Sequence, residues 1–132
     1  AFMGRQYYIE VSGNDFYIDI LMCNAFMHRY LVVELKRGEF QPEYIGKLNF
    51  YCSAVDDILC RAGDNQTIGL LLCQNKNRIM AEYALRDVHK PIGISDYELG
   101  KALPKDIKSG LPSIGELESK LSRELEDNTQ SL

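Results

Sequence analysis

Two carboxylates and one ammonium group in the first third of the chain have the types and spacing for chemistry at a phosphate. Glu34 and Lys36 are separated by a single residue, Leu35, and follow the apolar run Leu31–Val33. Side chains two residues apart leave the same face of a strand, so these two point together while Leu35 points into the core. Asp19 lies in the preceding apolar run. If the two runs pair antiparallel, Asp19 lies opposite or diagonal to Glu34.

Such a group is suited to binding a divalent cation. Two carboxylates about 4–5 Å apart repel each other, and an Mg²⁺ ion at about 2.1 Å from each oxygen relieves that repulsion. The main-chain carbonyl of Leu35 is a candidate third ligand. A bound ion activates water and stabilises charge on a phosphate oxygen, while Lys36 orients the water or neutralises the transition state. The alternative is a solvated Glu-x-Lys pair with no function, but charges beside a buried apolar run favour a functional site.

The elements that must position these residues can be predicted from periodicity and turn signals. Strands are expected at Gln6–Val11, Phe16–Met22, Arg29–Lys36, Thr67–Cys73 and Ile92–Leu99, and helices at Pro42–Ala62 and Ile79–Leu85. Gly38 is expected to break the third strand. A loop over 100–112 and a last helix from the capping box Ser113–Glu116 complete the chain. The order indicates an α/β domain, layered in an α+β manner, with a mixed central sheet flanked by helices.

Composition narrows the class of protein. The 132 residues are 45% apolar, which fits one packed domain. No apolar run approaches the roughly 20 residues of a membrane helix, and no signal peptide is visible. Four cysteines without a Cys-x-x-Cys pair argue against structural zinc and for reduced thiols in a cytoplasmic protein. Because the chain begins Ala-Phe-Met, we expect it to be a fragment of a longer protein.

Charge neither supports nor excludes a nucleic-acid partner. The net charge is −4, and the segment from Glu116 onward, with five acidic and two basic residues, accounts for −3 of it. The rest of the chain is therefore nearly neutral, without a strong basic stripe. There is also no Ser-His-Asp or Cys-His set and no glycine-rich phosphate loop.

An ordered series of short motifs resembles one known family. The series comprises Gly4–Tyr7, Tyr17–Leu21, Leu31–Lys36, Phe40–Tyr44, Asn49–Tyr51, Asn75–Asn77, Glu82–Leu85 and Lys90–Gly93. It resembles the C-terminal domain of the bacterial YhcG-like proteins, which are placed in the PD-(D/E)XK nuclease superfamily. The resemblance runs to about residue 117, leaving 118–132 as a C-terminal helix and frayed tail.

The resemblance implies a restriction-endonuclease-like core that hydrolyses DNA with Mg²⁺, or with Mn²⁺ in its place. Asp19 would match the metal-binding aspartate, and Glu34 and Lys36 the (D/E)-x-K pair. Relatives carry a separate N-terminal domain, which is absent here. Many also have a Gln-x-x-x-Tyr motif on the following helix, whereas this chain has Lys47 and Tyr51. We expect both to act in catalysis, although Lys47 is also explained as a sheet-edge residue and Tyr51 as core packing.

Weaker candidates and a second hypothesis remain. Glu10 is a candidate outer metal ligand, and Arg5, Lys76 and Arg78 are candidate phosphate contacts; a general-acid role for His89 has little support. The second hypothesis is a catalytically weakened or inactive module that binds nucleic acid or a protein partner, as a homodimer through the C-terminal helix. Lys47 and the nearly neutral body favour it. For either hypothesis DNA is a better candidate than RNA, and no membrane partner is expected.

Overall fold

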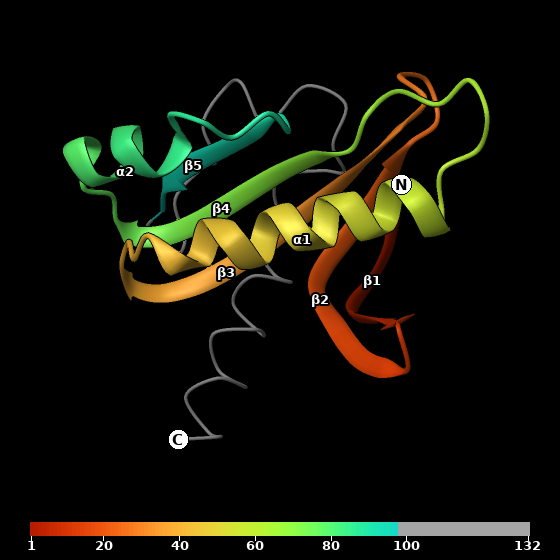
Figure 1. Cartoon of the computed structure of the whole chain (residues 1–132), viewed down its shortest axis with the longest axis horizontal. Coiled ribbons are helices and arrows are strands. Elements are labelled where there is room, and N and C mark those ends of the chain that lie inside the picture. Colours follow the sequence, from red (N-terminus) through yellow and green to blue (C-terminus); the bar gives the residue numbers. More distant parts are fainter. Residues whose placement is uncertain (98–132) are drawn as a thin grey trace.

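The computed structural model describes residues 1–97, which form a five-stranded mixed sheet with two helices. The elements are β1 (Phe2–Val11), β2 (Asn14–Asn24), β3 (Arg29–Glu39), α1 (Glu43–Ile58), β4 (Ile68–Asn75), α2 (Arg78–Leu85) and β5 (Ile92–Asp96). The strands lie side by side in chain order (Figure 1). Strand β2 is antiparallel to both β1 and β3, whereas β3, β4 and β5 are parallel to one another.

A tight hairpin joins β1 and β2. Val11 pairs with Asn14, so the loop is only Ser12 and Gly13, which both have positive φ, 52° and 78°. Two such residues form the type I′ turn that matches the twist of paired strands. Both strands are longer than the pattern predicted: β1 begins four residues earlier, at Phe2, and β2 begins at Asn14 because the end of the predicted turn cluster belongs to it.

The sheet forks between β2 and β3. The antiparallel pairing of these strands runs from Asn24 and Arg29 to Ile20 and Val33, and no further. Beyond that point the hairpin continues alone, while β3 continues beside β4 as far as Glu39 and Asn75. Figure 1 shows the hairpin curving away from β3 below α1. The fork therefore leaves the facing edges of β2 and β3 unpaired at Asp19 and Glu34, although β3 still pairs with β4 there.

Helix α1 covers one face of the sheet along β3 and β4 (Figure 1). Its apolar stripe is buried; the buried residues are Ile45, Leu48, Tyr51, Cys52, Ala54 and Val55. The face away from α1 carries a second core cluster that includes Ile20, Val33 and Leu35. Helix α1 ends four residues before the predicted end, because Asp64 binds the backbone N–H of Arg61 and closes a turn that competes with further helix.

Strand β3 does not break at Gly38, so that prediction was wrong. Gly38 has a φ of +89°, and the pairing of β3 with β4 shifts register between Lys36 and Glu39. Glycine tolerates this conformation, which makes a bulge within the strand rather than an end. The bulge lets β3 extend three residues beyond Lys36.

The predicted short helix and last strand are present in the described part. Asn77 caps α2 by accepting from the backbone N–H of Met80, and β5 pairs in parallel with β4. Residues 98 and 99, the loop over 100–112, the helix from Ser113 and the division at residue 117 lie outside the described residues. Neither helix within residues 1–97 is long and apolar enough to span a membrane.

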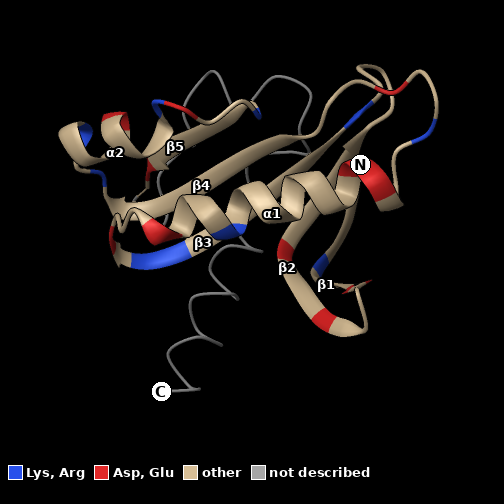
Figure 2. Ribbon diagram, in the orientation of Figure 1, with Lys and Arg blue, Asp and Glu red and all other residues tan. Residues whose placement is uncertain are grey.

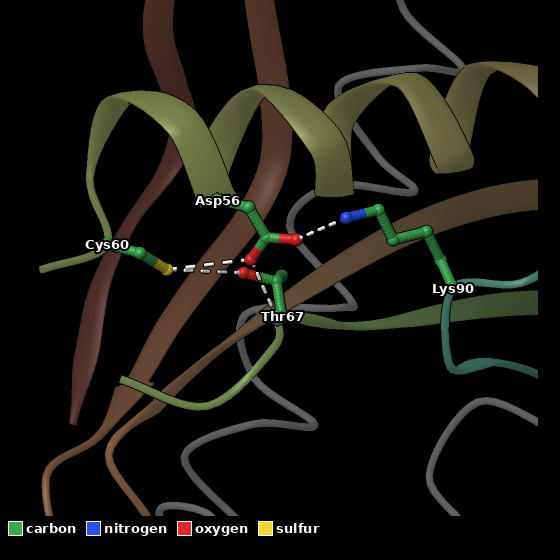
Figure 3. Close-up of polar contacts among 4 residues, drawn as sticks. All are labelled: Asp56, Cys60, Thr67 and Lys90. Carbon is green, nitrogen blue, oxygen red and sulfur yellow. Dashed lines mark hydrogen bonds and ion pairs between the residues drawn. The ribbon is translucent and has the colours of Figure 1, made fainter. Parts of the chain in front are cut away.

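A partly buried polar cluster fixes the end of α1 to its surroundings (Figure 3). Asp56 binds the Lys90 ammonium at 2.7 Å and accepts from the backbone N–H of Thr67 at 2.9 Å. Cys60 points its thiol at the same carboxylate. Burial alone would raise the pKa of Asp56, but the bonds from Lys90 and Thr67 outweigh it and lower that pKa. The carboxylate thus ties α1 to the start of β4 and to the residue preceding Pro91.

Candidate active site

Asp19 and Glu34 meet at the fork of the sheet; the sequence predicted that these two residues lie close together, but it did not predict the fork. The backbone N–H of Asp19 donates to Glu34 Oε2 at 2.9 Å, and the backbone N–H of Leu35 donates to Asp19 Oδ2 at 2.9 Å. Each carboxylate thus accepts a hydrogen bond from a backbone N–H that has no partner across the fork, because β2 and β3 no longer pair there. The two acidic groups are held side by side by the same feature that opens the sheet.

Glu34 is the most constrained group of the pair. Its side chain is 2% exposed, and its Oε1 atom is buried without a hydrogen-bond partner among the described residues. Burial, and then the charge of Asp19, raise the pKa of Glu34 to about 7, although the Asp19 N–H, Lys47 and Lys36 act in the opposite direction. A buried acceptor without a donor is unfavourable, and a cation beside it would remove that cost.

The backbone of Leu35 also faces the fork. Its side chain packs in the cluster on the far face, yet the residue lines the cleft beside Asp19, so its main chain is what reaches the cleft. In an extended strand the N–H and C=O of one residue point to the same side. Since the N–H points at Asp19, the carbonyl oxygen points toward the fork as well. Three oxygen-bearing groups therefore face one place.

The two lysines lie at the rim, each over an aromatic ring. Lys36 Nζ is 5.0 Å from the centre of the Tyr44 ring, and Lys47 Nζ is 5.6 Å from that of Tyr51. Tyr51 is buried, and its hydroxyl donates to the Tyr17 carbonyl at 3.3 Å. Burial, followed by the charges of Glu34 and Asp19, raises the pKa of Tyr51 to about 12, so it remains a donor. Tyr51 thus joins α1 to the hairpin as well as lining the site.

These groups surround an open cleft of about 670 Å³. It is lined by Gln6, Asp15, Phe16, Tyr17, Asp19, Leu35, Lys36, Arg37, Lys47 and Tyr51. Figure 2 shows basic positions on β3 and α1 and acidic positions on β2 where the hairpin parts from the rest of the sheet. Four of the five side chains predicted for catalysis line this cleft, and the fifth, Glu34, is buried beneath it.

Gln6 is a site residue to which the sequence analysis gave no role. Its amide donates to Asp19 Oδ1 at 3.2 Å, and its φ of 49° is in the left-handed region that side chains disfavour. Backbone strain of this kind collects at functional sites. Counting outward from the Ser12–Gly13 turn places Gln6 opposite Asp19, but a four-residue turn at 12–15 would have placed Tyr8 there instead.

The weaker candidates lie elsewhere. Glu10 is exposed near the hairpin tip, opposite Asp15, and Arg5 is exposed beside Ile20; neither lines the cleft. Lys76 and Arg78 line a separate hollow at the start of α2, and His89 is exposed in the loop after that helix. The geometry gives no support for a role of these residues in the Asp19–Glu34 site.

The donor set fits a hard divalent cation. No group of three or more His, Cys, Asp or Glu side chains suited to a metal occurs within residues 1–97. Two carboxylates and a main-chain carbonyl nevertheless supply the oxygen ligands that Mg²⁺ and Mn²⁺ take, with water completing the shell. The buried, unpartnered Glu34 Oε1 is the observation that favours a cation at this point.

A mixed sheet that forks beneath a helix, with Asp on the second strand and Glu-x-Lys on the third, defines an α/β fold of the PD-(D/E)XK, restriction-endonuclease-like class. Residues 1–112 match the family described as the YhcG PDDEXK nuclease domain, and the chain belongs to that family. The expected fold and resemblance are thereby confirmed. Nucleases of this class typically use divalent metal ions.

A curated relative of this chain is also described as a nuclease. "Putative nuclease YhcG" of Escherichia coli (strain K12) is 31% identical over 99 residues, which cover 75% of this chain and 26% of that protein. The match therefore spans about a quarter of the length of that relative. No solved structure matches the chain.

Proposed function

We propose that this domain hydrolyses phosphodiester bonds of DNA with Mg²⁺ or Mn²⁺. Asp19, Glu34 and the Leu35 carbonyl hold the ion in this proposal. The observation that carries it is the buried Glu34 Oε1, which has no donor in the described structure and lies beside a second carboxylate. Membership of a nuclease-domain family supports the same reading.

The chain's own residues prepare the site for this reaction. The bound ion would supply a more acidic water and would stabilise charge on the phosphate. Gln6 and the Leu35 N–H fix the Asp19 carboxylate, so its orientation requires no rearrangement during the reaction. Lys36 and Lys47, at the rim, neutralise the additional negative charge of the transition state.

The position of Lys47 is consistent with an active site. It extends along the Tyr51 ring toward the same cleft as Lys36, and its charge lowers the pKa of Glu34. A lysine there can bind a phosphate oxygen as a point charge. The side chain that departs from the family pattern is therefore able to share the work of Lys36.

Cleavage of plasmid and of labelled oligonucleotides with Mg²⁺ or Mn²⁺ tests the proposal. Asp19→Asn should reduce the rate at least about 100-fold, since a lost metal ligand removes several kcal/mol of stabilisation. Asp87→Asn is the matched control, because it removes an exposed carboxylate that does not line the cleft. Cleavage that survives Asp19→Asn, or that falls equally in both variants, rejects the assignment.

The alternative is a nuclease-fold module with a weakened or inactive site. It is favoured by Lys47 and by the bonds that already engage both Asp19 oxygens. Calorimetric titration with Mn²⁺ separates the hypotheses. A binding isotherm that disappears in Asp19→Asn supports the metal site, whereas a chain that binds no Mn²⁺ at millimolar concentration supports the inactive module.

A further inference from the structure

A ladder of side-chain pairs runs from Asp19 along one face of the hairpin. Tyr8 pairs with Tyr17, and Glu10 pairs with Asp15 at the tip. Gln6 continues the same register opposite Asp19 and donates to its carboxylate. Asp15, Tyr17 and Asp19 are alternate residues of β2, and all three line the cleft together with Gln6. The tyrosine pair is therefore the next step outward from the candidate metal ligand.

The two tyrosines of this ladder are held close together yet stay half exposed. Their ring centres are 5.5 Å apart, with 49° between the ring planes, and the residues are 49% and 50% exposed. The Tyr8 hydroxyl donates to Asp15 Oδ1 at 2.7 Å, which fixes the outer ring. Within residues 1–97 the pair is thus a positioned aromatic surface that remains accessible to a further planar group.

Charge divides the cleft into two sides. Lys36, Arg37 and Lys47 line the cleft from β3 and α1, whereas Asp15 lines it beside the tyrosine pair, and Glu10 lies next to Asp15 at the hairpin tip, outside the cleft. Phosphates are attracted to the first side and repelled by the second. These charges favour a nucleic-acid strand whose backbone lies toward the lysines and whose bases lie toward the tyrosines.

We propose that Tyr8 and Tyr17 form a stacking site for an unpaired base next to the phosphate at Asp19, so that the substrate is DNA with a single-stranded segment. This inference rests on the proposed hydrolytic site. Tyr17 is two residues from Asp19, roughly 7 Å along the strand, which a single nucleotide spans. An unpaired base offers a free face to an aromatic ring, whereas a base in a duplex must first leave its stack.

Binding without hydrolysis tests this proposal with the full chain. Fluorescence anisotropy in EDTA compares a fluorescein-labelled single-stranded oligonucleotide with the same sequence as a blunt duplex. The single strand should bind more tightly, and Tyr17→Leu should weaken it about tenfold or more while changing the duplex little. Tyr17→Phe, which retains the ring, should bind like the parent chain. Tyr83→Leu is the matched control, because Tyr83 is 64% exposed on α2, away from the cleft.

A second measurement reports the stacking of the base itself. A 2-aminopurine base in the single strand should lose fluorescence on binding the unaltered chain, and Tyr8→Leu should restore part of it. The proposal is overturned if the duplex binds as tightly as the single strand, if Tyr17→Leu binds normally, or if Tyr17→Phe is as impaired as Tyr17→Leu. Cleavage that depends on Asp19 with no effect of the tyrosines removes only this inference, whereas tyrosine-dependent binding without cleavage removes only the hydrolytic proposal.

Discussion

Replacing Glu34 with Gln should make the metal-free domain more stable at pH 8. In the native state the Glu34 carboxylate is buried beside Asp19, and one of its oxygens has no donor within the described residues. Glutamine keeps the shape and an oxygen for the Asp19 N–H, but it carries no charge. The substitution therefore removes the unfavourable burial and the repulsion, at the cost of a metal ligand.

The magnitude follows from the pKa of Glu34. Burial and Asp19 raise this pKa from 4.5 to about 7, which corresponds to about 3 kcal/mol. Because the native pKa lies above the unfolded value, the native state binds the proton more tightly. The stability of the native state therefore falls as pH rises from about 4.5 to about 7, and the loss persists above pH 7. The Gln variant lacks this fall.

Urea denaturation in EDTA at pH 5 and pH 8 measures the effect. At pH 8 the variant should be more stable by about 3 kcal/mol, or roughly 10 °C in Tm, and at pH 5 by much less. Glu39→Gln, an exposed change on the same strand, should leave both values nearly unchanged. Equal pH dependence in the parent chain and the Glu34→Gln variant would refute the reasoning, because it would mean that Glu34 is not held in an unfavourable charged state.

Two further predictions concern the packing of α1. Asp56→Ala should lower the free energy of unfolding by about 3 kcal/mol in chemical denaturation at pH 7, since it leaves the Lys90 ammonium and the Thr67 backbone N–H without their acceptor. Asp57→Ala, a change at the exposed neighbour, should lower it little, and similar losses for both variants would contradict the prediction. Gly69→Ala should lower stability by about 1–3 kcal/mol, because the new Cβ would lie 2.8 Å from Cys52 Sγ. In thermal melts Gly46→Ala, where nothing lies within 4 Å, should not be destabilising, and a tolerated Gly69→Ala would show that α1 can shift.

The sequence predicted the placement of the candidate residues better than it predicted the bounds of the elements around them. A two-residue period was enough to place Glu34 and Lys36 on one face, because that period is fixed by strand geometry. The position of Asp19 relative to Glu34 depends on the register that the loop between the two strands sets. The sequence does not fix that register, so it predicted only that Asp19 lies opposite or diagonal to Glu34. The structure settles the register through the loop between Asn24 and Arg29.

Other features depend on tertiary context that a single sequence does not encode locally. Gly38 has the same local signal whether it ends a strand or makes a bulge, and the neighbouring strand β4 decides the outcome. The role of Gln6 depends on the length of the first hairpin loop, because a change in that length moves every cross-strand partner. The sequence did not predict the fork. Both runs favour strands, and nothing in their local pattern indicates where two neighbouring strands stop pairing.

The fork also has a consequence for the order in which the domain assembles. Asp19 belongs to a hairpin closed by a two-residue loop, a contact that forms quickly because its partners are close in sequence. Glu34 lies just past the end of the β2–β3 pairing, on the part of β3 that pairs only with β4, and β4 follows the whole of α1, so this pairing requires a long segment to close first. Asp19 thus comes from a hairpin that forms quickly, and Glu34 from a strand pairing that forms slowly. The contact between the two residues requires both parts of the sheet to be in place.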